Sequence, residues 1–251
     1  PWGRGRPGWH IECSSIIKTY LGETIDIHLG GNDLIFPHHE NEIAQSNCAH
    51  DGKSLSKYWI HNGFISMDKE KMSKSVGNII LVNDILKNYT GEAIRLAMLT
   101  THYKQPLNWN ENILIQANKN LENFYDVIGD KKNFESIEPP KKFFDALLND
   151  LNTPEALKEL YELSKNKNTK DQLKSAANYL GILQLTKTEW INQRKKIKNL
   201  DQKKIEKLID NRNKARKEKN FVEADKIRDK LTLDNIILED SPSGTKWRIN
   251  N

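Results

Sequence analysis

The sequence lacks the features that mark membrane, secreted and disulfide-stabilised proteins. It has no run of about 18 apolar residues and no basic-then-apolar opening segment, so we expect neither a membrane span nor export. Only Cys13 and Cys48 occur among 251 residues, which favours reduced thiols in a cytoplasmic protein. The chain also begins at Pro1 without a methionine, and we interpret it as truncated.

Charge of both signs is present but unevenly placed. With 37 % hydrophobic and 29 % charged residues, the composition fits a globular protein of one or two domains. The formal net charge is +5, whereas residues 194–230 alone carry 15 Lys/Arg against 7 Asp/Glu. This basic segment favours docking of a polyanion, although a solvated lysine-rich helix explains the same pattern.

The first 60 residues have an α/β pattern. A helix is expected to open at residues 10–17, residues 25–29 alternate like a buried strand, and Gly30-Gly31 should break that strand. Pro37 suits the first turn of the next helix, which would continue through Ala44. This order predicts half of a nucleotide-binding sheet, with ligands where strands end and helices begin.

Later residues change from short strands to helices. Residues 59–88 predict short strands around an exposed loop at residues 69–75. Two charged helices and a closing hairpin with a turn at residues 241–244 are expected in the last 50 or so residues. Between these parts, apolar residues recur at steps of three and four, which predicts a helical bundle: residues 113–128, Phe143 to Leu151, and Leu157 to Leu163.

Cys13, His38 and Glu42 form a candidate metal site. His38 and Glu42 are four residues apart and therefore share one face of the predicted helix. Three protein ligands leave a position open on zinc, which could take a substrate thiolate. Such a metal would separate a thiol from a hydroxyl, whereas size alone gives only ~1–3 kcal/mol. Spacing leaves His10 and His39 as competing ligands, and ordinary core and surface roles remain an alternative for all of them.

A lysine-rich string offers a phosphate site. Lys71 and Lys74 are three residues apart and could neutralise charge on a triphosphate as pyrophosphate leaves. Two lysines at this spacing are, by themselves, typical of a solvated loop. The full string Lys71-Met72-Ser73-Lys74-Ser75, however, is the second signature of class I aminoacyl-tRNA synthetases, and it follows half of a Rossmann-like sheet here as it does in that class.

In order and spacing, segments along essentially the whole chain resemble cysteinyl-tRNA synthetases. The family's activity would be that of a cysteine–tRNA ligase, which forms cysteinyl-adenylate from L-cysteine and ATP and transfers cysteine to tRNA(Cys). The resemblance also implies one Zn²⁺ per chain, Mg²⁺ with ATP, and a monomer. The matching segments are Gly5 to Cys13, Gly30 to Asp33, Phe36 to Glu42, Lys71 to Ser75, Glu92 to Arg95, and Asp150 to Pro154.

The fold that the resemblance implies is α/β at first and then mostly α. Four parts are expected in chain order. Residues 1–60 would form the second half of a Rossmann-like class I synthetase catalytic domain with the zinc site, and residues 61–89 a KMSKS loop and connective region. Residues 90–196 would form a helical bundle that binds tRNA, and residues 197–251 a small α+β anticodon-binding module.

The resemblance also assigns roles to matching residues. Cys13, His38 and Glu42 would hold zinc together with a further cysteine from upstream, Trp9 would lie against the substrate cysteine, and His10 would line the floor of the site. A second set would bind ATP, with Lys74, helped by Lys71, at the phosphates and Asp33 at the ribose: Gly30, Gly31, Asp33, Lys71 and Lys74.

Residues of the terminal module match positions that read the anticodon in bacterial members of the family. These are Arg216, Asp225 and Asp240. Phe221 stands where a tryptophan is familiar, so we expect it to stack on a base.

One departure separates the chain from the family pattern, because its first signature, His-x-Gly-His, and the upstream zinc cysteine are absent. We therefore expect these 251 residues alone neither to make cysteinyl-adenylate nor to hold zinc at full strength. Two alternatives remain. A ligase joining cysteine to an amino-sugar would lack the basic terminal module, and the missing initiator methionine argues against a non-catalytic zinc- or RNA-binding module.

Overall fold

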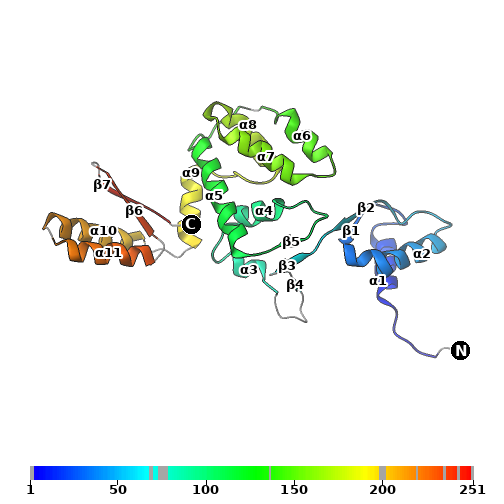
Figure 1. The fold of residues 1–251 in the computed structure, drawn as a ribbon. Coiled ribbons are helices and arrows are strands. Elements are labelled where there is room, and N and C mark those ends of the chain that lie inside the picture. The colour runs from blue at the N-terminus through cyan, green and yellow to red at the C-terminus, as the bar shows by residue number, and fades with distance from the viewer. Residues whose placement is uncertain are drawn as a thin grey trace. The chain divides into compact units, whose positions relative to one another are not determined.

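The structure is a computed structural model. It describes residues 3–67, 70–72, 79–135, 137–197, 202–218, 220–233, 236–241 and 244–249. The chain forms two compact units, one of residues 1–79 with 101–109 and the other of residues 80–100 with 110–251. Figure 1 labels the helices and strands of both units. None of the helices described is both long enough and apolar enough to span a bilayer.

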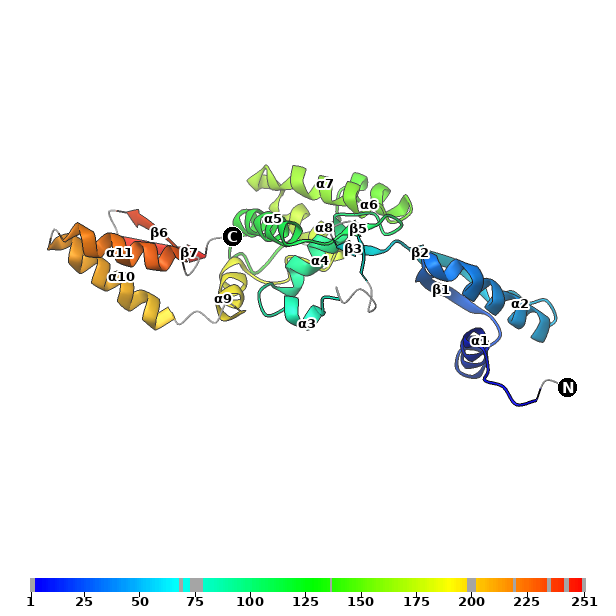
Figure 2. The same ribbon diagram turned by 60° about the horizontal axis from the view of Figure 1, so that its bottom comes forward.

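The first unit contains a parallel pair of strands beside two helices (Figure 2). The predicted helix at residues 10–17 and strand at 25–29 are both present. In chain order the elements are α1 (Trp9–Tyr20), β1 (Ile25–Gly31), a 3-10 turn (Asn32–Leu34), a π-helical turn (Ile35–His39), α2 (Glu40–Ala49) and β2 (Ser56–Asn62). Ile25 lies opposite Ser56 and Gly31 opposite Asn62.

Two details of this unit differ from the sequence-based expectation. Gly30-Gly31 does not break β1, because both glycines remain in register with β2. A Cβ on Gly30 would lie 2.5 Å from Cε1 of His39, so glycine is required for the close approach of that ring. The following α-helix begins at Glu40, and Pro37 lies in the π-helical turn directly before it, after an extended Phe36 (φ −131°, ψ 134°), as the residue before a proline prefers.

The two faces of the β1–β2 pair differ in their surroundings. His28 lies opposite Trp59, and their rings stack with centroids 4.5 Å apart. On the other face Ile27 is 50 % exposed and Leu29 is 65 % exposed. The prediction that residues 25–29 form a buried strand is therefore wrong for these two side chains.

A second, three-stranded sheet completes the first unit. Its strands are β3 (Ile65–Met67) in the centre, β4 (Glu70–Lys71) antiparallel to it and β5 (Leu107–Asn108) parallel to it. The loop expected at residues 69–75 thus contains a short strand at its start. Residues 73–78, which include Lys74, lie outside the described residues.

The second unit begins with a helical bundle, as the apolar periodicity predicts. Helix α5 packs against α4, α7, α8 and α9. At the centre of the bundle, Leu121 and Phe124 of α5 and Leu160 of α7 have no exposed surface. The helices are α3 (Val82–Ile85), α4 (Gly91–Leu99), α5 (Glu111–Ile128), α6 (Lys141–Leu148), α7 (Thr153–Ser164), α8 (Lys170–Tyr179) and α9 (Lys187–Ile197), with a 3-10 turn (Lys167–Thr169) before α8.

Helix α6 is shorter than its apolar spacing predicts. It ends at Leu148, because Asp150 and Leu151 take positive φ angles of 53° and 52°. Leu151, expected to continue the apolar stripe, is consequently 52 % exposed. Asn152 then caps α7, since its Oδ1 accepts the backbone N–H of Glu155 at 3.2 Å.

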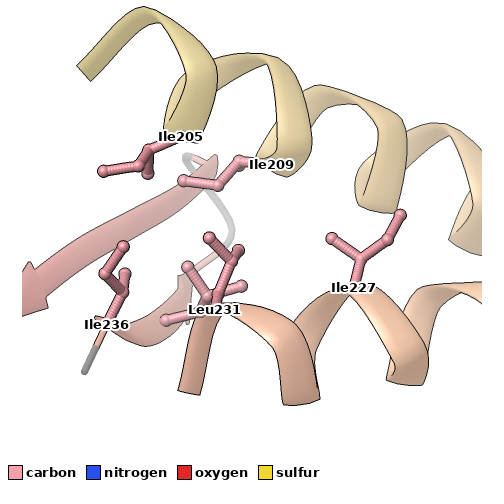
Figure 3. Packing of buried hydrophobic residues seen from close by; sticks show 6 residues of the cluster. Ile205, Ile209, Ile227, Leu231 and Ile236 are labelled. Carbon is pink, nitrogen blue, oxygen red and sulfur yellow. The ribbon is translucent and has the colours of Figure 1, made fainter. Parts of the chain in front are cut away.

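The end of the chain forms a helix pair with a hairpin, as expected. Its elements are α10 (Gln202–Lys217), α11 (Phe221–Leu233), β6 (Ile236–Ser241) and β7 (Gly244–Ile249). Aliphatic side chains from both helices and from β6 point toward one another (Figure 3). This small core consists of Ile205, Ile209, Ile227, Leu231, Ile236 and Leu238.

Candidate functional site

The three residues of the candidate metal site come together in the first unit. Cys13 belongs to α1, His38 to the turn before α2, and Glu42 to the first turn of α2. One potential ligand atom from each lies within 4.8 Å of the other two. His38 Nε2 is 2.5 Å from Glu42 Oε1, as the four-residue spacing predicts.

The surroundings of Glu42 fit a bound cation. Its side chain has no exposed surface, and neither oxygen has a hydrogen-bond partner of ordinary geometry among the described residues. Burial raises the pKa of Glu42, and burial together with the charge of Glu42 raises the pKa of Cys13. A buried carboxylate without compensating charge is costly. One thiolate, one imidazole and one carboxylate form a donor set that zinc accepts, with a position left for a further ligand.

A second group of candidate ligands shares the same carboxylate. His28, His39 and Glu42 also offer atoms within 4.8 Å of one another. His28 Nε2 is 3.4 Å from Glu42 Oε2, so the two carboxylate oxygens face different histidines. Burial and the neighbouring histidines lower the pKa of His39 to about 4, which keeps its ring neutral near pH 7. The alternative of His39 as a ligand, which spacing left open, therefore stays open.

His10 contacts the ring of a candidate ligand. Its Nδ1 lies 2.7 Å from Nδ1 of His38, on the side of that ring away from Glu42. Outer hydrogen bonds of this kind orient a ligating imidazole. Burial, followed by the effect of His10, lowers the pKa of His38, so the ring is available as a neutral ligand. Trp9 lies beside the same ring, with centroids 4.0 Å apart, and is 58 % exposed.

Three aromatic residues of the site were not expected from the sequence. His28, Trp59 and His61 lie on the face of the β1–β2 pair that carries the site, and His61 Nε2 is 2.8 Å from Nδ1 of His39. The two-residue spacing of Trp59 and His61 is a sequence signal that they share a face. The register that places Trp59 opposite His28 and His61 opposite Gly30 cannot be read from this spacing.

The residues expected to bind ATP are described only in part. Asp33 lies in the turn directly after β1, and a Cβ on Gly31 would be 2.6 Å from its Oδ1. Lys71 belongs to β4, and its side chain is not described. The structure therefore brings Gly30, Gly31 and Asp33 to the carboxyl end of β1, where nucleotides bind in open α/β sheets.

In the terminal module, Arg216 and Asp240 are in contact. Arg216 Nη1 donates to Asp240 Oδ2 at 3.0 Å. Phe221 is the first residue of α11 and is 60 % exposed. The sequence analysis missed Arg212, which donates to both oxygens of Asp240 at 2.9 and 2.7 Å. Its spacing four residues before Arg216, on the same helix face, was the available signal.

Comparison with known proteins gives the class first. Residues 1–119 match the family model described as the catalytic domain of class I (C) tRNA synthetases, and residues 142–184 match the DALR domain model. The chain thus contains sequence of a class I tRNA synthetase catalytic domain, followed by sequence of a DALR domain. One solved structure, a ternary complex of Agrobacterium radiobacter K84 agnB2 LeuRS with tRNA and LeuAMS, aligns with 62 % of this chain and 25 % of the LeuRS chain. Its sequence identity is 15 % and its TM-score is 0.48, so the similarity is too weak to bear on the fold.

Curated relatives narrow the class to a family. The cysteine–tRNA ligase of Parvibaculum lavamentivorans is 48 % identical over 99 % of this chain. Those of Maricaulis maris and Pelagibacter ubique are each 45 % identical over the same share. This chain belongs to the cysteine–tRNA ligase family, and it spans 56 % of the length of each of these three relatives.

Proposed function

We propose that the chain is part of an enzyme that activates L-cysteine with ATP, accompanied by Mg²⁺, and transfers it to tRNA(Cys). The single observation that carries the proposal is the buried carboxylate of Glu42 beside Cys13 and His38, without a lysine or arginine partner among the described residues. The names of the relatives support the same activity.

We assign the thiol site to Cys13, His38 and Glu42. Bound there, zinc supplies a Lewis acid that holds the substrate thiolate and discriminates against a hydroxyl. His10 fixes the orientation of His38 through their 2.7 Å contact. Trp9, beside the His38 ring and largely exposed, offers an apolar surface for the rest of the amino acid.

ATP would bind at the carboxyl end of β1. Its ribose would reach Asp33, and the two glycines would allow the backbone to approach the nucleotide closely. Lys74, assisted by Lys71, would counter the charge on the departing pyrophosphate. These roles follow from the family resemblance and from the place of the residues in the chain.

The terminal module would bind the anticodon of the tRNA. Arg216 and Asp225 are exposed and carry groups that hydrogen-bond base edges, and Phe221 offers a ring for stacking. Asp240 is the fourth expected residue of this set. A ligase for an amino-sugar acceptor would have no use for such a module, so this second candidate function is not favoured.

The test uses the full-length enzyme with Glu42→Ala or Cys13→Ser, and measures zinc content and cysteine-dependent ATP–pyrophosphate exchange. Each variant should lose most of its zinc, and exchange should fall by at least about 100-fold, since outer-shell changes alone cost 10–100-fold. Glu40→Ala removes an exposed carboxylate two residues away and should change neither. Full zinc occupancy in both site variants would refute the assignment.

A further inference from the structure

Arg212 is a buried cation in a module whose helices are otherwise covered with exposed charges. Its side chain is 3 % exposed, and its guanidinium donates two hydrogen bonds to the Asp240 carboxylate. Nη1 donates to Oδ1 at 2.9 Å, and Nη2 donates to Oδ2 at 2.7 Å. A buried charge is tolerated only when it is paired with good geometry. Planar two-point pairing also fixes the rotation of the carboxylate, which a lysine could not do.

Asp240 has little acceptor capacity left for a ligand. Besides Arg212, its Oδ2 accepts from Arg216 Nη1 at 3.0 Å. The Thr245 hydroxyl lies 2.8 Å from Oδ1, closer than its other acceptor, Asn213 Oδ1, at 3.1 Å. A carboxylate has about four lone-pair positions, and these four donors match that number.

Arg216, in contrast, retains donors for a ligand. Its side chain is 48 % exposed, and its hydrogen bond to Asp240, the one found within the described part of the chain, uses one of the five N–H donors of a guanidinium. The four-residue spacing on α10 places Arg212 and Arg216 on one helix face, so a single carboxylate from β6 reaches both. Asp225 adds a negative charge that also acts on Arg212.

We propose that Arg212 is a positioning residue for RNA recognition: it locks the Asp240 carboxylate, which holds the Arg216 guanidinium at one angle toward a base edge. Asp240 then acts on the base through its hydrogen bond with Arg216. The base recognised by Arg216 must present acceptor atoms, as guanine does at O6 and N7 and cytosine at O2 and N3. This inference rests on the proposed function, since it assumes that the module binds tRNA.

The test compares Arg212→Lys with wild type in the full-length enzyme. The measured quantity is kcat/KM for cysteinylation of the cognate tRNA and of tRNAs each changed at one anticodon base. Lysine keeps the positive charge but cannot form the two parallel hydrogen bonds to Asp240. We therefore expect kcat/KM for the cognate tRNA to fall about tenfold, near the low end of the effect of losing one base contact. The changed tRNA that already lacks the contact should lose little, and ATP–pyrophosphate exchange should stay constant.

A matched control separates orientation from charge. Lys207→Gln removes a positive charge from an exposed position on the same helix but leaves the two hydrogen bonds from Arg212 to Asp240 intact. It should lower kcat/KM for all tRNAs alike. Discrimination between cognate and changed tRNAs that is as large in Arg212→Lys as in wild type would overturn the proposal.

A second variant covers the case in which Arg212→Lys unfolds the terminal module. Thr245→Val removes one donor to Asp240 from a partly exposed position and should reduce discrimination several-fold while the melting temperature stays near that of wild type. Unchanged discrimination in this variant would also overturn the proposal. If wild-type enzyme loads no cysteine onto any tRNA, the proposed function itself fails, which is a distinct result.

Discussion

Glu42 is a carboxylate with no exposed surface, so its negative charge is costly to bury in the first unit. Its oxygens face His38 on one side and His28 on the other, and burial raises its pKa. Neutral histidines and a carboxylate are the protonation states that a divalent metal requires of its ligands. Because burial destabilises the bare carboxylate, a cation that binds Glu42 would compete with a proton for it.

The close approach of His39 to β1 leads to a prediction at Gly30. In Gly30→Ala the new Cβ would lie 2.5 Å from His39 Cε1, so the ring or the strand must move. Overpacking of this kind costs typically ~1–3 kcal/mol. We expect the full-length enzyme to unfold at a lower temperature and to show a raised KM for cysteine.

Gly91→Ala is the matched control for this change. Gly91 lies at the start of α4, and apart from its chain neighbours and the backbone of its own helix, no described atom lies within 4 Å of where its Cβ would be. Stability should be unchanged or slightly higher, because alanine favours a helix. A Gly30→Ala enzyme with wild-type melting temperature and KM would show that the His39 ring adjusts without cost.

The candidate site was predictable from the sequence only where its residues are local or form a motif. The spacing of His38 and Glu42 on consecutive turns gave their contact directly, and Cys13 was placed beside them by the family resemblance. His28 and His61 could not be placed beside His39, because their positions depend on how two strands pair across residues 32–55. Alternation indicates which side chains share a face but not which strand lies next to it.

At the scale of elements, the ion pair of Arg212 and Asp240 fastens α10 to β6. Hydrogen bonds from Arg212 lower the pKa of Asp240 well below its ordinary value. A carboxylate with a lowered folded-state pKa stabilises the fold above its unfolded pKa of about 4, and this contribution is lost as pH falls through the lowered pKa.

Asp240→Asn tests this linkage. We expect it to destabilise the terminal module by about 1–3 kcal/mol near pH 7, less than the ~3–5 kcal/mol for a fully buried pair, because the Asp240 side chain is 34 % exposed. The difference from wild type in thermal unfolding should be constant from pH 7 to 5 and shrink below pH 4. Asp210→Asn, at an exposed position of α10, should remain within about 0.5 kcal/mol. A gap that does not narrow in acid would contradict the linkage.

Element types followed from the sequence more readily than element ends. Three-to-four-residue periodicity predicted α5 and α7, since a buried stripe must recur at that step whatever it packs against. The end of α6 was missed because the left-handed conformation of Asp150 and Leu151 has no signal in hydrophobicity. The structure divides the chain into two compact units. The finer division into four domains stays a prediction.

For the whole molecule, charge is locally neutralised in one part of the chain and concentrated in another. In the bundle, Lys141, Lys158 and Lys165 each pair with a carboxylate one turn away. The basic segment at residues 194–230 has an excess of positive charge instead. Lysines that already pair with carboxylates neutralise fewer phosphates, so binding through them releases fewer of the counterions condensed on the RNA.

Binding of tRNA to the full-length enzyme should therefore weaken steeply with salt. If about four phosphates are contacted, the slope of log K against log salt is about −3. Replacing Lys207, Lys214 and Lys217 with glutamine should flatten this slope. The same change at Lys141, Lys158 and Lys165 should affect it much less, and equal effects of the two triple variants would refute a special role for the basic segment.

The pairing of β1 with β2 restricts where residues can be inserted or deleted in members of this family. Side-chain direction reverses at every residue of a strand, so inserting or deleting one residue within β1 or β2 would turn His28 or His61 to the opposite face. The stretch from His50 to Leu55, between α2 and β2, is not bound by this alternation. Insertions and deletions among functional relatives should consequently collect in that loop and spare both strands.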